Sequence, residues 1–172
     1  MTNNKNPSIL LLKSFLESRR VFTRKNLRNN QWKYSGFEEL ILNCGVVMEI
    51  QPLPKNINHG KPKNCYWNCQ QLAFKRKDLI YVEGYAIAED INFPLAHAWL
   101  LTNNGHAIDP TWETQGNCYL GVPFSTTWVK SFLAERKQRG KDNDLRIFES
   151  NYLEKFSLLK EGLPDDALVS LR

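Results

Sequence analysis

Three side chains that can carry out nucleophilic catalysis together occur in order along the middle of the chain. They are the thiol of Cys65, the imidazole of His97 and the carboxylate of Asp109. A cysteine attacks a carbonyl when a base accepts its proton and a third group orients that base. We therefore expect Cys65 to be a nucleophile, His97 its general base and acid, and Asp109 the group that orients His97.

The position of Cys65 favours its ionised form. A long loop over residues 51–63, rich in proline and asparagine, precedes a helical pattern that runs from Cys65 to about Arg76. The unpaired N–H groups and the dipole of a helix N-terminus favour a thiolate. Cys69 is one turn further along the same helix face, so we expect it to be a small core residue rather than a second nucleophile.

The meeting of His97 and Asp109 depends on one turn between two predicted strands. If the loop comprises residues 103–105, Trp99 lies opposite Asp109, and His97 is the diagonal neighbour on the same face. If residues 104–105 form a tight two-residue turn, the register shifts and Asp109 moves to the opposite face. The proposed triad therefore predicts the three-residue loop.

These motifs together resemble the core of the transglutaminase-like superfamily. The motifs are Cys65 at a helix start, Tyr81-Val82-Glu83-Gly84-Tyr85 on a strand, His97-Ala98-Trp99, and Asp109-Pro110-Thr111-Trp112. The resemblance covers about residues 61–124, and Cys69 departs from it by standing where a small residue such as alanine is usual. It implies a papain-like α+β fold, in which a helix bearing the cysteine packs on an antiparallel sheet carrying the histidine and the aspartate. It also implies the triad roles given above.

The length and composition are those of a globular protein, and we expect one domain. The chain has 172 residues, of which 42% are hydrophobic and 24% charged. We expect a basic, helical N-terminal flank with a loop over residues 1–60, the core over 61–124, and a mainly helical flank over 125–172. Outside the core, the patterns predict helices at about 7–20, from a Ser35/Glu38 capping box to Cys44, at 126–138 and at 152–160, and short strands at 46–50 and 145–148.

The oxyanion that forms during attack on a carbonyl needs hydrogen-bond donors. We expect the N–H of Cys65 to be one of them and the side chain of Asn64 or Asn58 to be another. Trp99 is a candidate residue of the cleft wall.

No metal or organic cofactor is required by this chemistry. The alternative is a zinc site made by Cys65 and Cys69 with His97 or His59. However, the three-residue spacing between the cysteines is a poor match to common zinc pairs, and a second pair is absent.

The expected function is therefore that of a thiol enzyme acting on a peptide, amide or acyl-thioester substrate through an acyl-enzyme. Hydrolysis would make it a cysteine peptidase or amidase, and capture by an amine would make it an acyl transferase.

The alternative function is a binding module that uses its basic front end. The first 35 residues hold eight basic residues and one acidic residue, a net charge of +7, with Trp32 and Tyr34 beside them. Such a segment can contact nucleic acid or an acidic partner. The longest apolar run near the start, residues 9–12, is too short for a leader or a membrane span, so we expect a cytoplasmic protein.

Overall fold

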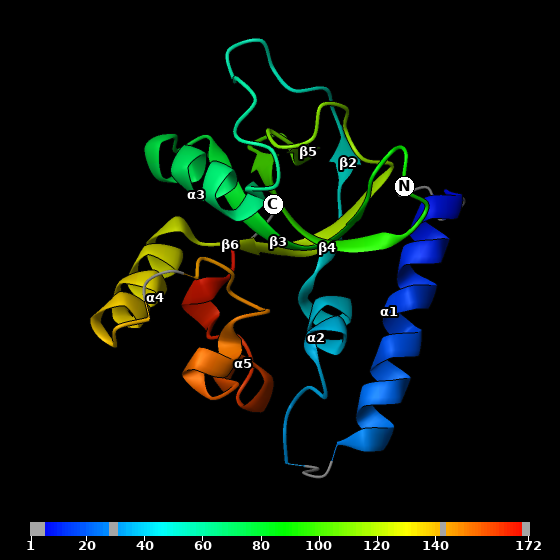
Figure 1. Ribbon diagram of the computed structural model, residues 1–172, viewed down its shortest axis with the longest axis vertical. Coiled ribbons are helices and arrows are strands. Elements are labelled where there is room, and N and C mark those ends of the chain that lie inside the picture. The colour runs from blue at the N-terminus through cyan, green and yellow to red at the C-terminus, as the bar shows by residue number, and fades with distance from the viewer. Residues whose placement is uncertain (1–5, 28–30, 142–143, 170–172) are drawn as a thin grey trace.

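A computed structural model describes residues 6–27, 31–141 and 144–169. It is a mixed α+β fold around a six-stranded sheet, as the sequence predicts (Figure 1). The strands are β1 (Val46–Val47), β2 (Glu49–Ile50), β3 (Leu79–Ile87), β4 (Pro94–Thr102), β5 (His106–Ile108) and β6 (Cys118–Phe124). The helices are α1 (Pro7–Asn26), α2 (Phe37–Cys44), α3 (Cys65–Lys75), α4 (Thr126–Gln138) and α5 (Ser157–Lys160), with 3-10 turns at Asn151–Glu154 and Asp165–Ala167.

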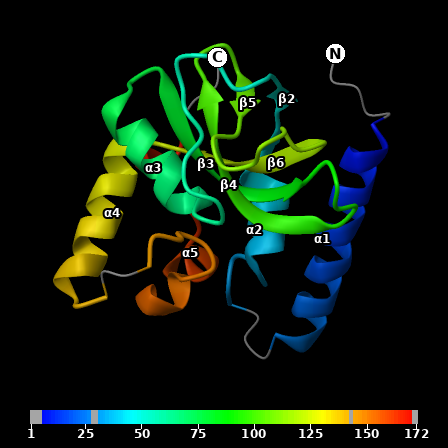
Figure 2. The same cartoon turned by 45° about the horizontal axis from the view of Figure 1, so that its top comes forward.

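The sheet curls until its two edges meet. Its strand order is β1-β6-β3-β4-β5-β2, so β1 and β2 lie at opposite ends although only Met48 separates them in the chain. The N–H of Met48 donates to Tyr119 O on β6, and the N–H of Gln51 donates to Ala107 O at the β5 edge. Figure 2 shows β2 close to both β5 and β6. All strand pairs are antiparallel except β2 with β5.

The curl separates two groups of buried side chains, because successive strand residues point to opposite faces. The inner group contains Trp99, whose indole N–H points to Met48 Sδ at 3.1 Å. The outer group takes in the buried faces of all five helices, including Leu12 and Leu16 of α1 and Cys69 of α3. Every helix therefore packs on the outside of the curled sheet.

Helix α1 ends six residues later than its sequence pattern predicts. Asn6 caps it by accepting a hydrogen bond from the N–H of Ser8, and Leu12 and Leu16 are its buried residues. Its second half is held by ion pairs to α2, with Arg19 to Glu38 at 3.3 Å and Arg24 to Glu39 at 2.6 Å. These partners lie outside the helix, so the periodicity of the helix does not reveal them.

The predicted capping box of α2 is wrong by one position. Gly36, rather than Ser35, is the N-cap residue, and no side chain caps the helix. The N–H of Ser35 instead donates to Glu39 Oε2 at 2.6 Å. Gly45 follows the helix end, as expected.

Three further elements differ from the prediction because distant partners decide them. The single strand expected at 46–50 is two strands, which pair with different edges of the sheet. Residues 145–148 form no strand, since the N–H groups of Ile147 and Phe148 donate to the buried carboxylate of Glu83. The helix expected at 152–160 is interrupted at Lys155 and Phe156, which have positive φ angles of 54° and 60°.

The elements of the expected core at 61–124 agree more closely with the sequence-based predictions than the flanking elements do. Helix α3 begins at Cys65, β3 has its predicted ends, and residues 51–63 form no helix or strand. The glycine of the Gly84-Tyr85 pair is required by the close approach of β6. A Cβ at Gly84 would lie 2.2 Å from Leu120 O and 2.4 Å from Gly121 Cα.

We therefore expect Gly84→Ala to lower the free energy of unfolding by about 3 kcal/mol, because β3 and β6 must move apart. The matched control is Gly105→Ala, where a Cβ would meet no atom within 4 Å but φ is +81°. That substitution should cost only about 1 kcal/mol. Urea denaturation of both variants measures the difference, and equal costs would contradict this account of Gly84.

Candidate active site

The loop between β4 and β5 has the three-residue form that the triad requires. Leu100 pairs with Ile108 and Leu101 with Ala107, so the register sets Trp99 opposite Asp109. The N–H of Gly105 donates to Thr102 O at 2.9 Å, and the positive φ of Gly105 closes the turn. The predicted three-residue loop is confirmed.

This register brings His97 and Asp109 into direct contact. His97 Nε2 lies 2.6 Å from Asp109 Oδ2, and the two side chains are 4% and 0% exposed. Because Asp109 occupies Nε2, the other ring nitrogen, Nδ1, is the one left for Cys65. The pair therefore has the base and the orienting group of a triad in a water-poor environment.

The carboxylate of Asp109 is held by three further donors. Its Oδ1 accepts the N–H groups of Thr111 at 2.8 Å and Trp112 at 3.3 Å. Its Oδ2 also accepts the hydroxyl of Tyr119 at 3.1 Å. Asp109 is thus fixed in the orientation that His97 needs.

Two aromatic residues that sequence reasoning missed support the pair. The ring of Trp112 stacks on His97, with centroids 4.0 Å apart and planes 11° apart. Tyr119 both donates to Asp109 and accepts the N–H of Gly116. Trp112 belongs to the Asp-Pro-Thr-Trp motif, which is a signal for its role, whereas Tyr119 looks like any strand aromatic in the sequence.

Helix α3 presents Cys65 at its first turn. Cys65 is its first residue and is 8% exposed, and Asn64 is its N-cap residue without a side-chain cap bond. Cys69 is fully buried, lies 3.4 Å from Ala98 O, and has a pKa raised by burial, which agrees with its predicted place in the core. Asn68 ties the helix start to the loop and to the Asp109 turn through Lys61 and Thr111.

Cys65 is one of the groups that raise the pKa of His97. Burial is the largest effect and lowers it, but the hydrogen bonds to Asp109 and Cys65 and the charges of both raise the pKa to about 9. The raised pKa favours the protonated form of the ring. An imidazolium beside a cysteine at a helix N-terminus stabilises a thiolate.

The other predicted site residues are not placed as expected. Trp99 stacks beside His97, with ring centroids 6.4 Å apart, but it is fully buried inside the curled sheet. The prediction that it lines a cleft is therefore wrong. Asn64 Nδ2 donates to Pro62 O at 2.9 Å, which turns the side chain back toward the loop. Asn58 is exposed on that loop. The N–H of Cys65 remains as the donor for an oxyanion.

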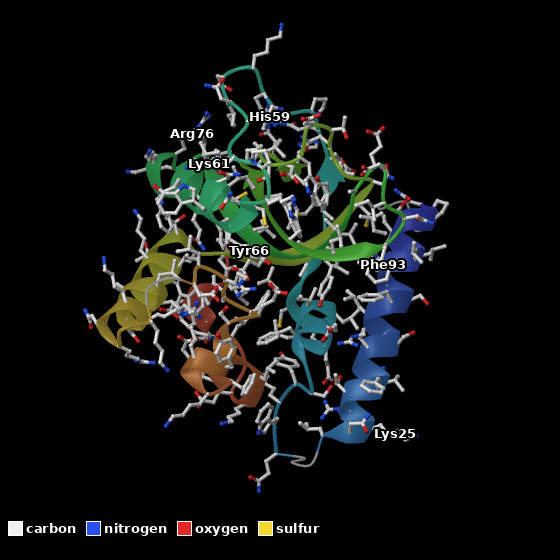
Figure 3. The ribbon with its side chains drawn as sticks, in the orientation of Figure 1. Lys25, His59, Lys61, Tyr66, Arg76 and Phe93 are labelled. Carbon is white, nitrogen blue, oxygen red and sulfur yellow. The ribbon has the colours of Figure 1, made fainter. Side chains whose placement is uncertain are left out.

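The described residues contain neither a cluster of potential metal ligands nor a helix that could span a membrane. In residues 6–27, 31–141 and 144–169, no group of three or more His, Cys, Asp or Glu side chains is placed to hold a metal ion. His59, one ligand of the zinc alternative, lies on the exposed loop at the top of Figure 3. Within the same described parts of the chain, no helix has the length and apolar character to cross a membrane.

The basic N-terminal segment is partly neutralised by its own neighbours. Arg19 and Arg24 pair with α2, and Arg20 pairs with Glu17 at 2.7 Å. Trp32 packs on Phe156, and Tyr34 is buried. Lys5 and Arg28 lie outside the described residues. Binding of nucleic acid or an acidic partner by this segment stays a prediction.

Comparison of the chain with protein-family models, with curated proteins and with solved structures found no significant match. The site itself consists of a thiol at a helix start, an imidazole with a raised pKa and a buried carboxylate.

We expect Cys65→Ala to lower the pKa of His97 below its value of about 9, because the substitution removes a hydrogen-bond partner and a negative charge. Cys69→Ala is the matched control, since Cys69 is not among the groups that shift His97. NMR titration of the imidazole resonances of His97 measures both. An unchanged midpoint in Cys65→Ala would contradict an interaction between Cys65 and His97.

Proposed function

We propose that this protein is a thiol enzyme that attacks an amide or thioester carbonyl and forms an acyl-enzyme. The observation that carries the proposal is the buried 2.6 Å contact between His97 Nε2 and Asp109 Oδ2, with Cys65 among the groups that raise the pKa of the ring. A nucleophile, a base and an orienting group held in this order are the parts that acyl transfer through cysteine needs.

In the proposed reaction, Cys65 Sγ attacks the carbonyl carbon and the carbonyl electron pair moves to oxygen. The N–H of Cys65 at the start of α3 stabilises the resulting oxyanion. His97 then gives its proton to the leaving nitrogen or sulfur as the bond to carbon breaks. The acyl group remains on Cys65 as a thioester, and Asp109 keeps its charge and the orientation of the ring throughout.

A second nucleophile resolves the acyl-enzyme. His97, now neutral, accepts a proton from water or from an amine as it attacks the thioester, and the thiolate leaves. Water gives a peptidase or amidase, and an amine gives an acyl transferase. We favour hydrolysis, because water is always available to the intermediate.

We also propose that the fold is a papain-like variant of the transglutaminase-like superfamily. Support comes from the order of the parts: a helix that begins with the cysteine, then β3, then β4 with His97, then the carboxylate after β5. Helix α3 packs against β4 through Cys69 and Ala98, in the part of β4 that β5 does not pair with.

The thiol proposal is tested by limiting iodoacetamide near pH 7, with the modified cysteine identified by mass spectrometry. We expect carboxamidomethylation at Cys65 first, and its loss in Cys65→Ala. Burial raises the pKa of Cys118 to about 11 and also raises that of Cys69 well above its usual value, so both should react slowly, and half-buried Cys44 is the internal comparison. His97→Gln should slow the reaction of Cys65 on the order of tenfold or more.

Equal modification of Cys44 and Cys65 would contradict an activated thiol. Asp109→Asn provides a second check, because it retains the volume of the side chain while removing the charge that helps to hold the proton on His97. It should slow alkylation of Cys65 in the same direction as His97→Gln.

A further inference from the structure

A cavity of about 310 Å³ opens on His97 and has no part in the chemistry described so far. It lies between α2, the first turn of α3, β3 and the segment at 148–149. Tyr66, the residue after the nucleophile, contributes one wall. Figure 3 shows Tyr66 near the middle of the molecule, where α3 faces the C-terminal part of the chain.

The polar lining of this cavity is acidic. Glu38 and Glu149 line it together with the buried Glu83. Among the residues that the structure describes, no lysine or arginine lines it, and His97 is its single basic residue. A concave site lined by carboxylates attracts positive charge. Glu38 and Glu149 are the main source of this attraction, because burial raises the pKa of Glu83 to about 7 and favours its neutral form.

Two tyrosine hydroxyls hold the carboxylates in place. Tyr85 donates to Glu38 Oε1 at 3.2 Å, and Tyr66 donates to Glu149 Oε2 at 3.2 Å. The guanidinium groups that pair with Glu38 and Glu149, those of Arg19 and Arg146, do not line the cavity. In each of these ion pairs, the glutamate lines the cavity and the arginine does not.

The negative charges around the cavity also raise the pKa values of its two tyrosines. Burial is the main cause that raises the pKa of Tyr66, and the charges of Glu83 and Glu149 raise it further. Burial likewise raises the pKa of Tyr85, followed by the charge of Glu38. Negative charge that disfavours a phenolate in this cavity favours a cation in the same place.

The remaining walls are apolar. Phe37, Ile41 and Phe148 line the cavity, and the rings of Phe37 and Phe148 pack with centroids 5.3 Å apart. Lysine and arginine side chains combine an aliphatic stem with a cationic end, and they lie well where apolar surface leads to carboxylates. A neutral aliphatic side chain would use only the apolar part of this site.

Hydrogen bonds to Glu83 hold the cavity wall in position. Its carboxylate accepts the hydroxyl of Tyr81 at 2.6 Å and the N–H groups of Ile147 at 2.7 Å and Phe148 at 3.1 Å. These bonds attach the segment that carries Phe148 and Glu149 to β3. The acidic wall is therefore in place before any substrate binds.

We propose that this cavity binds the lysine or arginine side chain of the residue that donates the acyl group, so that the enzyme acts on basic peptides. The proposal rests on the proposed function of Cys65, His97 and Asp109. It identifies Glu38 and Glu149 as specificity-determining residues beside the reacting carbonyl.

The test uses peptidyl chloromethyl ketones that differ only at the residue bearing the ketone, which is lysine, norleucine or glutamate. Attack by Cys65 Sγ on the methylene carbon expels chloride and leaves a thioether, so each rate constant reports recognition next to the nucleophile. We expect the lysine probe to react with Cys65 on the order of tenfold faster than the norleucine probe. The glutamate probe should be the slowest.

The lysine-to-norleucine rate ratio is then compared between variants, so any inactive fraction cancels. Glu149→Gln and Glu38→Gln should lower the ratio toward one, and Glu149→Lys should make the glutamate probe faster than the lysine probe. Glu135→Gln is the matched control for Glu149→Gln, because Glu135 and Glu149 are both exposed carboxylates paired with an arginine, but Glu135 lies on α4, where it pairs with Arg139. It should keep the ratio of the unmodified protein.

The outcomes separate the two proposals. If iodoacetamide modifies Cys65 selectively but the lysine and norleucine probes react equally, or neither reacts, the proposed cation-binding role of the acidic cavity is wrong and the thiol enzyme stands. If Cys65 shows no selective reaction with any reagent, the proposed function fails and the substrate proposal fails with it.

Discussion

The burial of the Asp109 carboxylate is the constraint on which the rest of the site depends. A fully buried carboxylate is costly unless donors surround it. Its donors come from three parts of the chain: His97 on β4, Thr111 and Trp112 on the turn that follows, and Tyr119 on β6. Satisfying that one charge therefore requires β4, β5 and β6 to be in register, and the same arrangement orients the imidazole.

A second buried carboxylate organises the opposite side of the site. Glu83 holds the segment at 147–148 through two backbone N–H groups, and this segment carries Phe148 and Glu149 into the wall of the cavity. Burial raises the pKa of Glu83 to about 7, although the hydrogen bonds from Tyr81, Ile147 and Phe148 lower it. The cost of burying Glu83 is thus offset by bonds that shape the cavity, just as the cost at Asp109 is offset by bonds that orient His97.

Helix α3 joins these two sides. Its first residue is Cys65, its second is Tyr66 of the cavity, and Asn68 connects it to Thr111 in the Asp109 turn. Because these side chains belong to one short helix, nucleophile and cavity wall keep their relative position. The curl of the sheet provides the rigid support, with Trp99 and Met48 packed inside it and the helices outside.

The sequence by itself determined the start of α3 at Cys65 and the ends of β3, since these depend on residue patterns that lie close together in the chain. The turn residues left two loops open, at 103–105 and at 104–105, and the three-residue loop was predicted because the triad requires His97 and Asp109 to meet. Only the tertiary structure decided the later end of α1, the division at Met48 and the irregular path of residues 145–160, where partners lie far away in sequence. Tertiary contacts also decided the roles of Tyr119 and Trp112 and the position of the acidic cavity. A hydrogen bond, a ring stack or a cavity between remote segments leaves no local pattern in the sequence.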